Sequence, residues 1–187
     1  MVHLFEAKPL YDIFDTRLTN LLKRYFRYGT KAGRVDKKLK TLLSDAIAKA
    51  YYAGAESAGM SYKDFNDEMS QQVDDFTYKQ FEYLDKFIRD IKSALKDEGS
   101  RPAIFDRVHW WKQTVLSAKL LGESYVKAKE LVRWELGYTE EHCDTCLELN
   151  GQVHPRNWFV EKGYIPKMPG AKMDCKGFQC DCKWAKV

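Results

Sequence analysis

The sequence predicts a mainly α-helical protein: an elongated bundle of about four long helices, followed by a small irregular C-terminal unit with a short β-hairpin. Apolar residues recur at three- and four-residue steps through most of residues 10–136, which is typical of amphipathic helices. All five cysteines lie after residue 142. We therefore divide the chain into a helical body with an N-terminal arm, residues 1–137, and a cysteine-rich tail, residues 138–187.

The first two helices follow an extended arm of residues 1–9. The apolar stripe of the first helix begins at residue 10, and Gly29 is a suitable residue to end it. The second helix is predicted over residues 35–59. Its last third is rich in alanine and glycine, which would allow another helix to approach closely.

The third and fourth helices are predicted to be the longest. Ser61, with Asp64 three residues later, resembles a helix N-cap, and the apolar spacing continues to about residue 98. After a loop with glycine and proline, a fourth helix is predicted over residues 103–136. Gly122 is a candidate position for a kink in it.

The charge is unevenly distributed along the chain. The net charge is only +4, but residues 1–50 hold eleven Lys and Arg against five Asp and Glu, whereas residues 51–100 hold six against eleven. A basic cluster decorates the first helix and its exit: Arg17, Lys23, Arg24, Arg27, Lys31 and Arg34. This cluster is either a solvated helix face or a contact surface for DNA phosphates or for an acidic partner protein.

Several classes of function are not expected. The first residues have no apolar signal-peptide core, and no window approaches eighteen consecutive apolar residues, so we expect no membrane span. The sequence has no glycine-rich phosphate loop and no carboxylate pair in a setting that shifts pKa values. We therefore expect a protein that is not an enzyme.

The cysteines of the tail are spaced like metal ligands. Cys143 and Cys146 form a C-x-x-C pair, which lets two thiolates converge on one ion. Cys180 and Cys182 lie on one side of an extended chain, and Cys175 precedes them. Four soft ligands in a reducing cytoplasm favour Zn²⁺, so we predict a structural zinc site made by Cys143, Cys146, Cys175 and either Cys180 or Cys182.

Alternatives for the tail remain open. His142 or His154 could replace one of the thiolates. Two disulfides could form if the mature protein lives outside cells, leaving one cysteine over. A thiol or zinc enzyme is a further hypothesis, although a site with four thiolates leaves no open position for substrate or water.

The tail also resembles a known family. The matching features are Trp134 and Gly137, the C-x-x-C after Glu141 and His142, the turn Asn150-Gly151, an aromatic at Trp158 or Phe159, Pro166 or Pro169, and a closing C-x-G-x-x-C-x-C. Together they resemble the C-terminal region of tailed-phage minor head proteins, the head morphogenesis proteins similar to the F protein of phage Mu. Cys175 stands where that family has a histidine, so the likeness supports the other cysteines as ligands better than this one.

The resemblance implies a virion protein made in the host cytoplasm and present in several copies inside the head, at or near the portal. Portal protein, major capsid protein and packaged DNA are the partners it implies, in head assembly, DNA packaging or ejection. The main alternative is a DNA-binding protein that uses the basic N-terminal helices, with the basic residues from Arg17 to Lys40 in contact with DNA phosphates.

Overall fold

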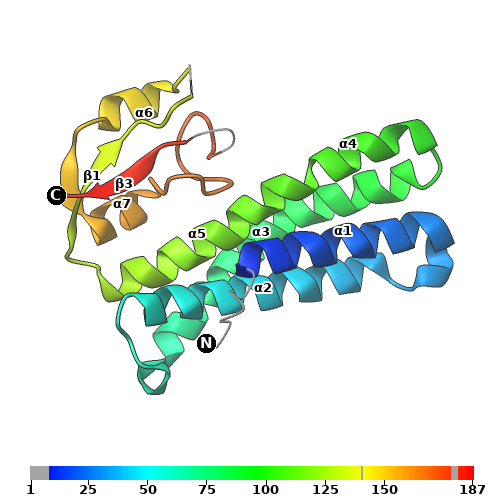
Figure 1. The fold of residues 1–187 in the computed structure, drawn as a ribbon, viewed down its shortest axis with the longest axis horizontal. Coiled ribbons are helices and arrows are strands. Elements are labelled where there is room, and N and C mark those ends of the chain that lie inside the picture. Colours follow the sequence, from blue (N-terminus) through cyan, green and yellow to red (C-terminus); the bar gives the residue numbers. More distant parts are fainter. Residues whose placement is uncertain (1–8, 140, 178–180) are drawn as a thin grey trace, which may run out of the picture.

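The computed structural model describes residues 9–139, 141–177 and 181–187, and it is mainly helical. Long helices make up the body: α1 (Leu10–Tyr28), α2 (Val35–Ser57), α3 (Asp67–Ala94) and α5 (Val108–Val126), with a short α4 (Arg101–Asp106) before α5. These helices lie side by side along the long axis of the molecule, and the C-terminal unit sits against α5 near one end (Figure 1).

The start of α3 differs from the prediction. Ser61 does act as a cap, but of a single short turn, where its hydroxyl accepts a hydrogen bond from the backbone of Lys63 at 3.4 Å. The cap of α3 itself is Asn66, whose side-chain oxygen accepts a 3.0 Å hydrogen bond from the backbone N–H of Met69. Two acidic residues, Asp67 and Glu68, follow in the first turn and favour the positive end of the helix dipole.

Helices α2 and α5 cross in backbone contact through two glycines. A Cβ atom added to Gly54 would lie 2.0 Å from the carbonyl oxygen of Lys119, and one added to Gly122 would lie 1.9 Å from that of Tyr51. The prediction that the small residues of α2 permit a close helix is therefore confirmed. Gly122 is needed for this crossing. Helix α5 continues past Gly122 as one helix.

The predicted fourth helix is divided at Arg107 into α4 and α5, and the prediction of a helix is wrong beyond residue 126. Residues Leu131–Glu135 form strand β1, in which Val132 and Trp134 are fully buried while Leu131 and Arg133 are exposed. This period-two burial fits a strand because successive side chains point to opposite faces. The apolar residues Leu131 and Trp134 also lie three apart, so the segment fits the helical spacing as well.

The C-terminal unit is built on a three-stranded antiparallel sheet in place of the expected hairpin. The strand order is β2-β1-β3, with β2 (Val153–Pro155) and β3 (Lys183–Lys186) on either side of β1. In the register, Val132 faces His154 on one side and Lys186 on the other. Two short helices, α6 (Asp144–Leu149) and α7 (Arg156–Lys162), complete the unit.

The unit has its own apolar cluster, which includes Val132, Trp134 and Phe159. Two hydrogen bonds join the loop between α7 and Cys175 to the helical body. Buried Gln80 donates to the carbonyl of Pro169, and Ser117 donates to that of Lys167, both at 3.3 Å. These bonds seat the loop before Cys175 on α3 and α5.

Candidate metal centre

Three thiols of the C-terminal unit meet in one place. Cys143 is the N-cap of α6, Cys146 lies in the first turn of that helix, and Cys175 lies in the turn that precedes β3. Their sulfur atoms all lie within 4.8 Å of one another. Cys146 is buried and the other two are half-buried, so the group sits at the edge of the apolar cluster.

The backbone around Cys143 favours its ionised form. Burial by itself raises the pKa of this thiol, but hydrogen bonds from the backbones and the thiols of Cys146 and Cys175 together outweigh burial and lower the pKa below its ordinary value. Burial, together with the neighbouring Cys143, raises the pKa of Cys175. A thiolate held by backbone N–H groups beside two further thiols is the arrangement that binds a soft cation.

A polar clamp holds the two halves of the site together. The carboxylate of Asp174 accepts hydrogen bonds from the backbone N–H of Thr145 at 3.0 Å and from its hydroxyl at 2.6 Å. The Thr145 side-chain and backbone hydrogen bonds lower the pKa of Asp174. Since Thr145 lies between the first two cysteines and Asp174 precedes the third, the clamp fixes the distance across the site.

The turn after Cys175 depends on a glycine. Gly177 has φ +74°, and a Cβ atom there would lie 1.9 Å from the carbonyl oxygen of Met168. Only glycine permits this close approach of two backbone segments. The turn therefore carries Cys175 back towards α6, an effect that the cysteine spacing alone does not reveal.

The donor set fits a zinc ion. With Zn–S bonds of about 2.3 Å, tetrahedral ligand sulfurs lie about 3.8 Å apart, so small movements would bring these three thiols to ligand geometry. No disulfide joins Cys143, Cys146, Cys175 and Cys182 to one another. Thiolate ligands select zinc over harder cations such as magnesium.

The remaining predicted ligands have different positions. Cys182 is fully buried in the apolar cluster, and its sulfur lies 3.9 Å from Nδ1 of His142; neither residue belongs to the group of three. His154 stacks on Trp158 with ring centroids 3.8 Å apart, so it packs in the aromatic part of the unit. Cys180 lies outside the described residues.

The six residues of the predicted basic cluster have different surroundings. Arg34 pairs with Asp36 at 3.0 Å, and Arg27 lies over the ring of Tyr28. Arg17 and Arg24 line hollows between α1 and α2. Lys23 is exposed on α1, and Lys31 is exposed in the turn after it.

The acidic residues of α3 contact cations from other parts of the body. Asp85 pairs with Lys40 of α2 at 2.8 Å, and Asp90 pairs with Arg107, the residue between α4 and α5, at 2.6 Å. Helix α1 instead contributes an acid, since its Asp12 pairs with Lys112 of α5 at 2.9 Å. The basic start and the acidic middle of the chain are thus linked through α2.

No family model matches the chain, and no curated protein or solved structure matches it significantly. No helix among the described residues is both long enough and apolar enough to cross a membrane.

Proposed function

We propose that the C-terminal unit is held together by one structural Zn²⁺ bound to Cys143, Cys146 and Cys175, with a fourth ligand from the closing C-x-C of Cys180 and Cys182. The observation that supports this most directly is the convergence of three sulfurs within 4.8 Å from two segments about thirty residues apart. Four thiolates close the coordination sphere, so the metal holds the fold and leaves no position for substrate.

The size of the unit supports a structural role for the metal. Its apolar cluster has only eight buried members among the described residues, and its strands have only five, three and four residues. So small a core supplies little folding energy by itself, and a metal that binds only the folded unit adds its binding energy to stability.

The metal can be tested on the purified protein. Chain prepared without chelator is expected to contain one zinc per molecule by elemental analysis, and thiol titration should become complete only after the zinc is removed. A metal-free protein with fewer titratable thiols before reduction than after would instead indicate disulfides.

The Thr145–Asp174 clamp provides a finer test. Thr145→Val and Asp174→Ala are each expected to weaken zinc binding by about 10-fold, the usual effect of removing a group that orients a ligand. Zinc competition with a chromogenic chelator measures this. Asp144→Ala is the matched control, because it removes an equal charge beside Cys143 but no hydrogen bond of the clamp. Equal losses in Asp144→Ala and Asp174→Ala would mean that charge alone matters.

For the whole chain, we propose a structural protein of a tailed-phage head that docks at the portal or the inner capsid surface. The motif resemblance of the tail supports this proposal, together with a helical body that leads directly into the cysteine-containing unit. Such a protein acts in head assembly, DNA packaging or ejection without catalysing a reaction.

The virion proposal is tested on particles. Mass spectrometry of purified heads from cells that carry the gene should find this chain at several copies per particle, together with the portal protein. Intact, DNA-filled heads that lack the chain would contradict the proposal, and this result would leave the zinc site untouched.

A further inference from the structure

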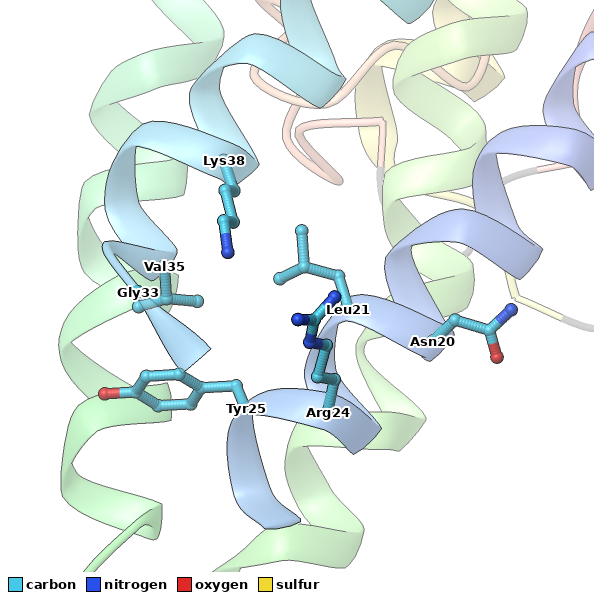
Figure 2. Close-up of a pocket in the computed structure, with 7 residues that line it drawn as sticks. All are labelled: Asn20, Leu21, Arg24, Tyr25, Gly33, Val35 and Lys38. Carbon is cyan, nitrogen blue, oxygen red and sulfur yellow. The ribbon is translucent and has the colours of Figure 1, made fainter. Parts of the chain in front are cut away.

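A groove runs between α1 and α2, on the helical body. It begins in a hollow of about 280 Å³ beside the turn that joins the two helices. In Figure 2 the side chains of Arg24, from α1, and Lys38, from α2, point towards this hollow, with Leu21 between them.

Two further hollows continue the groove along the helix pair. Leu21 and Lys38 line both the first and the second hollow. The second and third share Arg17, Leu42 and Asp45. The three hollows are therefore one continuous depression, and its α1 wall runs from Arg24 to Leu10. That wall is about 21 Å long at 1.5 Å per residue.

The walls of the groove are basic on both sides. Exposed cations line it from α1 and from α2: Arg17, Arg24, Lys37, Lys38 and Lys49. The acid among its lining residues is Asp45. This charge is complementary to an acidic partner.

The side chains on the floor of the groove indicate which kind of acidic partner fits. It is formed by half-buried aliphatic side chains, including Ile13, Leu21 and Leu42. The aromatic residues that line the groove, Phe14 and Tyr25, are 4% and 5% exposed and offer no ring face on which a base could stack. An aliphatic floor between cationic walls matches a helix with one apolar stripe and acidic flanks.

We propose that this groove binds an acidic amphipathic helix of about fourteen residues from a partner protein. Leucine-like side chains of that helix occupy the three hollows at helical spacing. Its carboxylates meet Arg17 and Arg24 on one side and the α2 lysines on the other. No residue of the groove comes from the C-terminal unit, so the inference does not depend on the metal.

The proposal can be tested with designed probes on the full chain. The first is a fluorescent fifteen-residue helical peptide with leucines at i, i+3, i+7 and i+10 and glutamates flanking them. The second is a scrambled peptide of the same composition without an apolar stripe, and the third is a double-stranded DNA oligonucleotide. Fluorescence anisotropy should give a Kd of about 10 µM for the first peptide. The scrambled peptide should bind about 10-fold more weakly.

Charge-reversed variants test whether the first peptide binds in the groove. Arg17→Glu combined with Arg24→Glu should raise the Kd of the first peptide about 10-fold, since attraction becomes repulsion at both positions. Lys79→Glu combined with Arg89→Glu is the matched control: it makes the same charge change at exposed positions of α3 and should leave the Kd within about 2-fold.

Three results would overturn the proposal. The scrambled peptide or the DNA could compete as well as the first peptide, which would make the surface a general polyanion site. The control variant could weaken binding as much as the groove variant. The first peptide could also show no binding at about 1 mM, which would exclude docking of this class of helix.

Discussion

Replacing Gly122 by alanine is expected to lower the free energy of unfolding by about 3 kcal/mol, although alanine normally stabilises a helix interior by about 1 kcal/mol relative to glycine. The added methyl group would lie 1.9 Å from the carbonyl oxygen of Tyr51 and 3.1 Å from the backbone nitrogen of Ala55. Both atoms belong to the backbone of α2, so no side chain can rotate away. The two helices must separate, and the core contacts on both sides of the crossing weaken.

Chemical denaturation followed by far-ultraviolet circular dichroism measures this loss. Gly54→Ala should cost a similar amount, because its methyl group would meet the backbone of Lys119 from the other side of the same crossing. The variant with both substitutions should lose less free energy of unfolding than the sum of the two single losses, since the helices need to separate only once. Gly99→Ala is the control, because its methyl group would meet only a side-chain oxygen, at the ordinary distance of 3.4 Å. A Gly122→Ala protein as stable as Gly99→Ala would show that the helices do not pack this closely.

The Cys143→Ser and Cys146→Ser double variant is expected to lose its zinc and to unfold the C-terminal unit. Hydrogen exchange at β1 should then approach that of an unfolded segment, because the metal binding energy no longer supports the sheet. Exchange in α2 and α5 should stay slow, since those helices have an apolar core of their own. Chelator treatment of the unaltered protein should give the same exchange pattern.

The closing C-x-C provides the control for this experiment. One of Cys180→Ser and Cys182→Ser is expected to lose the zinc, and the other should retain it and keep β1 protected. Burial of Cys182 predicts a modest loss of stability for its variant in either case, because a polar hydroxyl replaces a buried thiol. Zinc retained at full stoichiometry by the double variant would mean that Cys143 and Cys146 do not hold it.

The strand β1 illustrates a limit of local patterns. The segment from Leu131 to Glu135 fits a helix by the spacing of Leu131 and Trp134, and it fits a strand by the alternation of Val132 and Trp134. Five residues are too few for either period to dominate. Pairing with β2 and β3 makes this segment a strand, and these two strands lie about twenty and fifty residues later in the chain.

The basic cluster illustrates a second limit. Sequence proximity grouped Arg17, Arg24 and Arg34, but only the first two line the groove, whereas Arg34 pairs with Asp36. The opposite wall comes from α2, and its lysines lie outside the cluster of six, although the footprint of the DNA-binding alternative extended to Lys40. Which cations face one another depends on how two helices pack, and sequence distance does not encode that packing.

The sequence by itself predicted the helical character of the body and the three clustered thiols, Cys143, Cys146 and Cys175. Helical periodicity is a local property, and the spacing of Cys143 and Cys146 fits a single turn. Only the tertiary structure showed how the chain brings Cys175 to the other two thiols and that Cys182 lies apart, beside His142. The reason is that the path of the intervening loop is set by distant contacts: Gln80 with Pro169, Asp174 with Thr145, and the close approach at Gly177.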